Sequence, residues 1–111
     1  MSSSPATERR QFTRHPLVTS VEFYHAPSKR EFPGRTVDIS RGGMRMYVPA
    51  TAPVHPGQCV RLQAGTLGET EAGDFGEGKL DATIVRVDRR DLLDHGHIAV
   101  ALKFHTVAAK R

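Results

Sequence analysis

The sequence predicts an all-β protein, a six-stranded antiparallel barrel preceded by a flexible N-terminal arm. Three observations support this class. Apolar and polar residues alternate in six short segments, which are spaced about ten residues apart. The chain holds 10 Gly and 7 Pro, which favour many short elements joined by turns. No segment of useful length has a helical period, and short strands at this spacing are typical of a closed or partly closed barrel.

The six strands are expected where apolar residues occupy every second position. Val21 and Phe23 mark the first strand, which should end at the turn beginning with His25. The second strand is expected to carry Val37 and Ile39 on one face, and the change of parity at Val85 predicts a bulge or a change of face in the fifth. The expected strands cover residues 18–24, 32–39, 44–48, 59–62, 80–87 and 98–104.

The connections are predicted from their turn residues. Residues 40–43, Ser-Arg-Gly-Gly, give the strongest hairpin signal in the sequence. Pro49, Pro53 and Pro56 mark a connection that cannot be a central strand. Residues 64–78 hold five Gly and four acidic residues, which predict a long exposed loop, and residues 88–96 are expected to form a turn.

A chain of 111 residues favours one domain. We expect a flexible arm at 1–15, the barrel at 16–105 and a short tail at 106–111. Cys59 is the only cysteine, so an intramolecular disulfide is impossible and a reducing compartment is favoured. The N-terminus has no apolar signal-peptide core and no window approaches a membrane span. We therefore expect a soluble, cytoplasmic protein without membrane insertion.

The net charge of +4, with a pI near 9.7, favours an anionic partner without choosing among nucleotides, nucleic acids and acidic membranes. Arg9, Arg10 and Arg14 lie close together before any apolar pattern begins. Arg10 and Arg14 are spaced as RxxxR. A guanidinium group is planar, permanently charged and forked, so it binds phosphate or the O6/N7 edge of guanine with two parallel hydrogen bonds. The alternative is a solvated basic tail without a ligand.

A second motif lies at the predicted hairpin. Asp38 and Ser40 are two residues apart, so on a strand both side chains emerge on one face. The carboxylate accepts from guanine N–H groups, the hydroxyl donates to phosphate, and Gly43 leaves room for a base or a backbone to approach closely. The alternative is an ordinary hairpin whose Asp and Ser bond the turn amides and whose glycines take positive φ.

RxxxR followed by DxSxxG, in this order and with this strand pattern, resembles the signature of the PilZ domain family. The resemblance extends over nearly the whole chain and includes the closing segment 99–104, Ala-Val-Ala-Leu-Lys-Phe. It implies a PilZ-type barrel that binds cyclic di-GMP and is not an enzyme. Arg10 and Arg14 then wrap the dinucleotide, Asp38 and Ser40 contact guanine and phosphate, and Gly43 makes room.

The resemblance also bears on three further positions. An arginine immediately before RxxxR, here Arg9, tends to accompany a stacked dimer of the ligand in the family. Arg86 lies on the fifth strand where family members often place a residue that touches the ligand, and its guanidinium is able to stack on guanine; an exposed strand arginine is the alternative. Ala101 stands where the family usually has Gly, and its methyl group either crowds a base or merely fills space.

Metal binding and catalysis have no convincing pattern. His95 and His97 form the closest histidine pair, and nothing supplies a third ligand at a recognisable spacing. Cys59 has no local motif of a nucleophile and alternates with core residues, as a structural thiol would. The loop carboxylates form no spaced acid–base pair. We therefore expect no metal, no cofactor and no catalytic residue.

Two other functions stay open at this point. A small basic barrel that binds single-stranded nucleic acid fits the pI and the β content, but the chain lacks a face of interleaved aromatic and basic residues. A PilZ protein that has lost its ligand and acts as an adaptor is the other alternative. The favoured interpretation is a receptor whose arm folds over cyclic di-GMP and signals to a separate protein.

Overall fold

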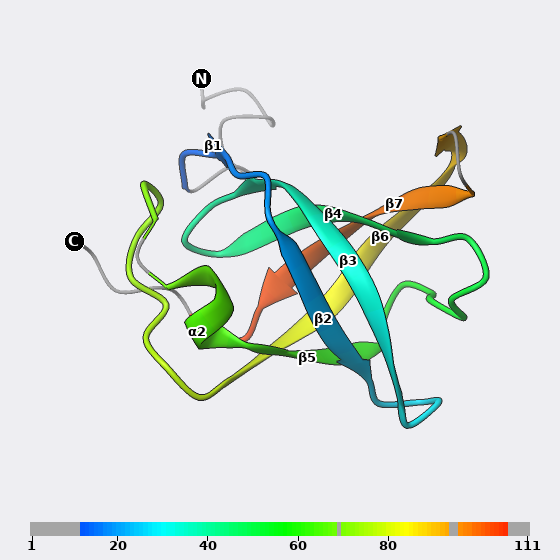
Figure 1. The fold of residues 1–111 in the computed structure, drawn as a ribbon, viewed down its shortest axis with the longest axis horizontal. Coiled ribbons are helices and arrows are strands. Elements are labelled where there is room, and N and C mark those ends of the chain that lie inside the picture. The colour runs from blue at the N-terminus through cyan, green and yellow to red at the C-terminus, as the bar shows by residue number, and fades with distance from the viewer. Residues whose placement is uncertain (1–11, 69, 94–95, 107–111) are drawn as a thin grey trace, which may run out of the picture.

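The computed structural model describes residues 12–68, 70–93 and 96–106 (Figure 1). The described chain is nearly all-β, with one short helix. The arm expected at 1–15 lies outside the described residues up to position 11, and so does most of the tail expected at 106–111. The elements are β1 His15–Pro16, β2 Ser20–His25, β3 Arg30–Ile39, β4 Gly43–Pro49, β5 Cys59–Gln63, α2 Ala64–Leu67, β6 Lys79–Leu93 and β7 His97–Phe104.

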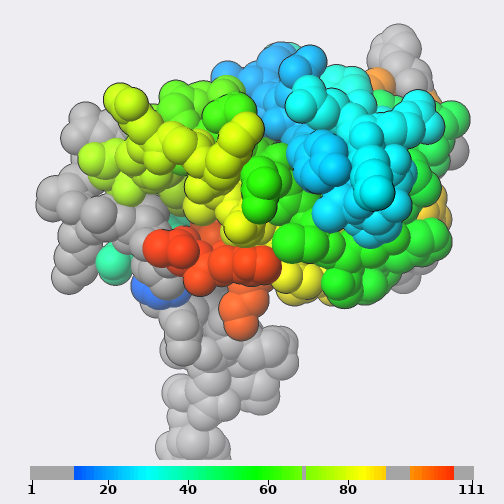
Figure 2. All heavy atoms as spheres, turned by 90° about the horizontal axis from the view of Figure 1, so that it is seen from below, coloured from blue at the N-terminus to red at the C-terminus, as the bar shows by residue number. Residues whose placement is uncertain are grey.

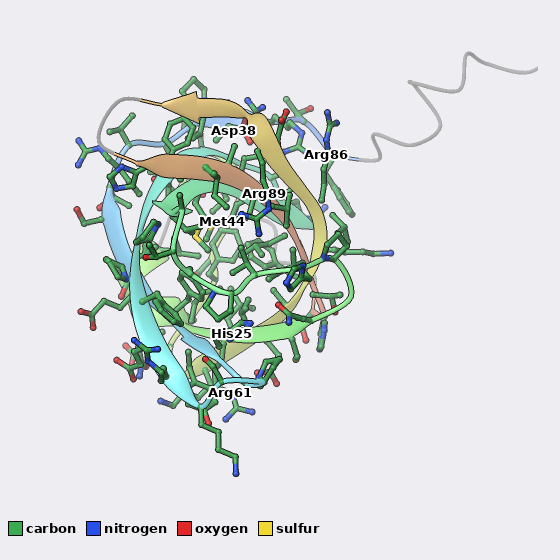
Figure 3. All side chains as sticks on the ribbon, turned by 90° about the vertical axis from the view of Figure 1, so that its right-hand side faces the viewer. His25, Asp38, Met44, Arg61, Arg86 and Arg89 are labelled. Atoms are coloured by element: carbon green, nitrogen blue, oxygen red, sulfur yellow. The ribbon has the colours of Figure 1, made fainter. Side chains whose placement is uncertain are left out.

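Six strands, β2 to β7, close into an antiparallel barrel, as the sequence predicted. Neighbouring strands follow the order β3-β2-β5-β6-β7-β4, and the additional pairing of β3 with β4 completes the ring. Figure 3 shows the strands encircling a core of side chains, with Met44 inside and Arg61 outside. Closure leaves none of the six strands as a free edge, which protects the sheet from pairing with other chains.

The core follows the alternation that predicted the strands. Val21 and Phe23 of β2, and Met44, Met46 and Val48 of β4, are all buried, while the residues between them point outward or are partly exposed. Buried apolar area is the main stabilising term in folding. The inward-facing residues of the first strand were predicted correctly, and the observed strand begins two residues later than expected.

The strand β1 was not predicted, and it pairs with β3 beyond the end of β2. His15 lies opposite Ile39, and Pro16 lies opposite Asp38. β1 and β2 thus form one interrupted strand along β3. The interruption is filled by the buried Thr36, whose hydroxyl donates to the carbonyl of Leu17 at 2.6 Å and accepts from the amide of Thr19 at 2.8 Å.

The register of β3 shifts between Thr36 and Asp38. As a result Thr36 and Ile39 are buried, and Val37 is only half-buried. The expectation that Val37 and Ile39 share one face was therefore wrong. A bulge reverses which residues of a strand face inward. Thr36 is able to face the core because its hydroxyl bonds the backbone.

The segment 64–78 is not the exposed loop that its composition predicted. Its first residues form α2, and Ala64, Leu67 and Ala72 are buried. The ring of Phe75 packs edge-on against Phe104 of β7, with centroids 5.3 Å apart, and Figure 2 shows this yellow-green segment covering one side beside the red end of β7. The four apolar side chains of this segment hold it against the barrel, because each one covers part of the core surface. The many Gly and acidic residues around them had indicated an exposed loop. Among the described residues, no helix has the length and apolar character needed to cross a membrane.

The segment 88–96 is not a simple turn either. β6 continues to Leu93, which lies opposite His97 of β7. The charged sequence of this segment lacks the alternation of a half-buried strand, so it resembled a turn. The predicted bulge in β6 is confirmed, since the register shifts between Ile84 and Arg86.

Candidate ligand-binding site

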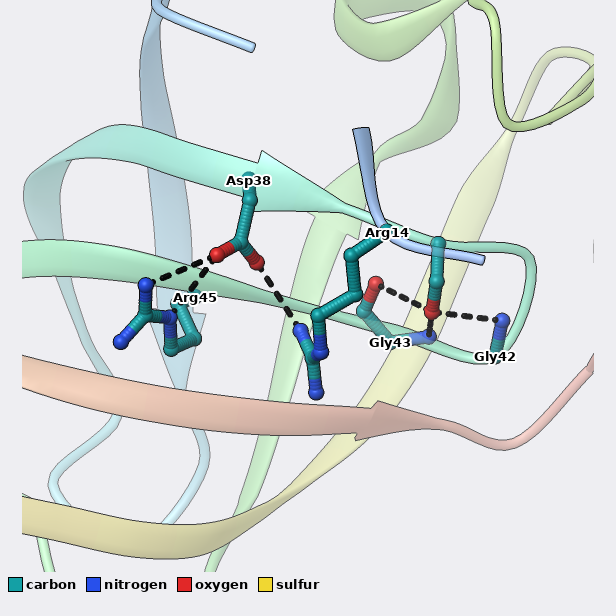
Figure 4. A network of polar contacts seen from close by, with 6 residues as sticks. Arg14, Asp38, Gly42, Gly43 and Arg45 are labelled. Carbon is teal, nitrogen blue, oxygen red and sulfur yellow. Dashed lines mark hydrogen bonds and ion pairs between the residues drawn. The ribbon is translucent and has the colours of Figure 1, made fainter. Parts of the chain in front are cut away.

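The β3–β4 hairpin holds the DxSxxG motif at the surface of the barrel (Figure 4). Asp38 is on β3, Ser40 lies in the turn, and Gly43 is the first residue of β4. β1 lies beside Asp38 and brings the chain of the arm to this hairpin. The fold thus places the second arginine of RxxxR next to the second motif, 24 positions away in sequence.

Asp38 is bonded by two arginines at once. Arg14 Nη1 donates to Asp38 Oδ1 at 2.9 Å, and Arg45 donates to Asp38 Oδ2 from both Nε and Nη2 at 2.9 Å. The carboxylate is largely covered, at 15% exposure, while the two arginine side chains are 38% and 50% exposed. Two guanidinium groups around one carboxylate leave a positive charge in excess, which favours an anionic ligand.

Arg45 was not predicted as a site residue, although its position opposite Asp38 in the hairpin indicated it. Arg45 lies directly opposite Asp38 in the hairpin register, and its neighbours Met44 and Met46 are buried, so its side chain must point outward with that of Asp38. Opposite charges at facing positions of an antiparallel pair attract one another.

Ser40 is buried in the turn and does not share a strand face with Asp38, because β3 ends at Ile39. Its hydroxyl accepts from the amides of Gly42 at 3.3 Å and Gly43 at 3.1 Å, and it donates to the carbonyl of Gly43 at 3.2 Å. The Ser40 hydroxyl therefore bonds the backbone of the turn, as the ordinary-hairpin alternative predicted for this residue. A contact of Ser40 with phosphate stays a prediction, and it would require the hydroxyl to rotate away from Gly43.

Gly43 is required by a close approach of backbone. A β carbon on Gly43 would collide with the carbonyl oxygen of Leu102 on β7. Neither Gly42 nor Gly43 has a φ in the left-handed region, so the positive φ that belonged to the ordinary-hairpin alternative is not found. The absence of a side chain at Gly43 lets β4 lie tightly against the closing strand.

One row of side chains crosses the outer face from β3 to β6. Asp38 lies opposite Arg45, Arg45 opposite Ala101, and Ala101 opposite Arg86. Arg86 is 69% exposed, and its Nη2 is 3.9 Å from Asp88 Oδ2. The row therefore has a small methyl group at Ala101 between two arginines. This arrangement suits a flat, anionic molecule that lies on the sheet.

A comparison of the sequence with protein-family models matches the PilZ domain over residues 8–110, which is almost the whole chain. The chain belongs to the PilZ domain family. PilZ domains are receptors for cyclic di-GMP and are generally non-enzymatic. A search of curated proteins finds no match to this chain.

The PilZ match begins before the described part of the chain. Arg9 and Arg10 lie outside the described residues, so their roles stay predictions. Arg14 and Asp38 are in contact, and Arg86 lies in the same cross-strand row as Asp38. Two other predicted ligand residues within the described ranges lie outside this row: the Ser40 side chain bonds the turn, and Gly43 lies opposite Lys103.

Outside this row, the PilZ barrel carries a second arginine–aspartate pair. Arg61 Nε of β5 donates to Asp81 Oδ1 of β6 at 2.7 Å, and this hydrogen bond lowers the pKa of Asp81 from its ordinary value. Both side chains are exposed. In the described ranges, no group of three or more His, Cys, Asp or Glu side chains is arranged to hold a metal ion, and Cys59 is exposed on β5.

Proposed function

We propose that this PilZ protein is a receptor for cyclic di-GMP, which binds over the row formed by Asp38, Arg45, Ala101 and Arg86. The single observation that supports this most is the contact of Arg14 with Asp38. It joins the two motifs of the family at one exposed point of the barrel. A ligand that carries both phosphates and guanine edges has a partner there for each kind of group.

The chemistry of the proposed site follows from its charges. Asp38 accepts hydrogen bonds and is able to bind the N1–H and N2–H donors of guanine. Arg14 binds either phosphate or the O6/N7 edge with a forked pair of bonds. Arg45 contacts Asp38 through its own donors, so the carboxylate keeps a cationic partner when Arg14 turns to the ligand. Arg86 then stacks on a guanine base or pairs with a phosphate.

We further propose that ligand binding orders the arm and so creates a surface for a separate partner protein. Arg9 and Arg10 complete the cation set around the phosphates in this scheme, and Arg9 favours a stacked pair of ligands. Ordering arm residues costs about 1–2 kcal/mol each, so the net affinity is moderate. The class of partner is a downstream protein that recognises the folded arm together with the barrel.

Isothermal titration tests the proposed function directly. Cyclic di-GMP should release or absorb heat and saturate, while GTP and a short single-stranded oligonucleotide should not. Two ligands per chain would support the role of Arg9, and one ligand per chain under excess would contradict it. Binding of the oligonucleotide with no response to cyclic di-GMP would favour the nucleic-acid barrel instead. No response to any of the three would favour an adaptor without a ligand.

Ser40 gives a further test of the site. Ser40→Ala is expected to weaken the binding of cyclic di-GMP by about 1–3 kcal/mol, the range for a hydrogen bond to a charged group. The matched control is Ser20→Ala, since Ser20 is exposed at the start of β2. Thermal unfolding should be measured on both variants, because the Ser40 hydroxyl also holds the turn. Unchanged affinity in Ser40→Ala would remove this residue from the site.

A further inference from the structure

Phe12, inside the RxxxR segment, packs onto the hairpin turn. A β carbon on Gly42 would stand only 2.9 Å from Phe12 Cδ2 and 3.0 Å from Cε2. The guanidinium carbon of Arg41 lies 5.2 Å from the centroid of the same ring, a distance at which a cation is attracted to the face of an aromatic ring. Phe12 is half-buried by this arrangement. We call Gly42 and Arg41 the ring seat.

The ring seat explains why Gly42 has no side chain. The φ of Gly42 is outside the left-handed region, so its backbone conformation does not demand glycine. The backbone at Gly42 is also held firmly. Its amide donates to Ser40 Oγ at 3.3 Å, and its carbonyl accepts from the amide of Phe104 at 2.8 Å. The ring of Phe12 therefore rests on a fixed surface that any β carbon would disrupt.

Resting on the cyclic di-GMP function proposed above, we infer that Phe12 is a positioning residue for the ligand, which acts by anchoring the arm to the ring seat. Arg14 and β1 hold the chain from position 14 onward. Phe12 adds a second anchor before Thr13. Phe12 is two residues from Arg10 in the sequence, so an anchor at Phe12 holds the chain closer to Arg10 than the contact of Arg14 does.

The anchor acts on affinity through conformational entropy. Each arm residue that becomes ordered only when the ligand binds loses conformational entropy, and this loss weakens the affinity. Residues already held by the ring seat do not add this cost, and they raise the local concentration of the arginines at the site. Phe12 itself need not touch the ligand. Its effect would reach the ligand through the arginines on either side of it.

A double-mutant cycle tests the ring seat by titration with cyclic di-GMP. Phe12→Ala should weaken binding about 5- to 30-fold, which corresponds to ordering one more residue. Gly42→Ala should weaken binding similarly, because its methyl group displaces the ring. The double variant should be no weaker than Phe12→Ala alone, since both changes remove the same contact. Phe12→Tyr should bind like the wild type, and Gly65→Ala, at an open position, is the control.

The possible outcomes separate this inference from the receptor function. Normal binding by Phe12→Ala, or additive losses in the double variant, would overturn the ring seat and leave the receptor function intact. A wild-type chain that gives no heat would remove both. A ligand-free measurement examines the contact itself: an Overhauser effect between the Phe12 ring protons and the α protons of Gly42 is expected, and its absence in the wild type would contradict the geometry.

Discussion

The β3–β4 hairpin and the β5–β6 hairpin each carry an Arg–Asp pair on the outer face, and their surroundings differ. In the β3–β4 hairpin, Arg14 and Arg45 share one largely covered carboxylate, and one arginine comes from a distant part of the chain. In the β5–β6 hairpin, one arginine, Arg61, faces one carboxylate, Asp81, with exposures of 49% and 40%. The first arrangement keeps a positive charge in excess and joins three segments of the chain, while the second pairs one positive with one negative charge. Only the first has the properties of an anion site.

The largest expected effect is on ligand binding. Arg14→Ala should weaken the binding of cyclic di-GMP by about 100-fold or more, because a forked contact with a charged group contributes about 1.5–3 kcal/mol per hydrogen bond. Arg61→Ala should leave binding unchanged. Titration of both variants checks this. The thermal midpoint of the free protein should move little in either, since exposed ion pairs stabilise proteins weakly. Equal losses in the two variants would contradict the distinction between the hairpins.

The second effect concerns stability. Gly43→Ala should lower the free energy of unfolding by about 1–3 kcal/mol, the usual cost of inserting a methyl group into a well-packed site, because the β carbon meets the Leu102 carbonyl. Gly65→Ala in α2 has nothing within 4 Å of its β carbon, so it should be neutral or stabilising. Chemical denaturation of both variants measures the difference. A Gly43→Ala protein as stable as the wild type would show that β4 and β7 are able to separate at this point.

The third effect tests the sharing of Asp38. Arg45→Ala should weaken the binding of cyclic di-GMP by about 1 kcal/mol, comparable with the upper value for an exposed ion pair. The reason is that Asp38 then holds Arg14 alone and the face loses a positive charge. The affinity of the wild type should also fall more steeply with added salt than that of Arg45→Ala. Tighter binding by the variant would show that Arg45 competes with the ligand for Asp38.

The smallest effect is expected at the β5–β6 hairpin and depends on pH. The hydrogen bond from Arg61 lowers the pKa of folded Asp81, so this pair stabilises the fold above the ordinary carboxyl pKa. Its contribution should disappear as the pH falls through the lowered value. The difference in unfolding free energy between wild type and Asp81→Asn should therefore be small at pH 7 and absent in acid. A difference that grows in acid would contradict this sign.

The sequence predicted the six barrel strands because apolar residues recur at every second position over most of each strand, as Met44, Met46 and Val48 do. It failed where tertiary contacts replace local pattern. The burial of Thr36 depends on backbone groups of the β1–β2 junction. The apolar residues of the 64–78 segment have no regular spacing, because glycines and acidic residues separate them. The extension of β6 to Leu93 depends on its pairing with β7, which charged residues do not signal.

At the site, the two motifs predicted Arg14 and Asp38, and the contact between these residues is consistent with the pairing of the motifs. The direction of the Ser40 side chain was not predictable, because it depends on where β3 ends. Arg45 was visible as an outward residue opposite Asp38 only once the hairpin register was fixed. Phe12 carried no signal by itself, since its partner is a glycine in the turn.

The gap between β1 and β2 has a consequence for how the molecule moves. Thr36 bonds the chain on both sides of the gap, so β2 keeps its own ladder with β3 and β5 whether or not β1 is attached. β1 contributes only two residue pairs, and separating so short a segment breaks few bonds. Local opening of such segments requires far less free energy than global unfolding. β1 and the barrel strands should therefore exchange amide hydrogens on different timescales, because β1 is able to detach while β2 stays paired with β3 and β5.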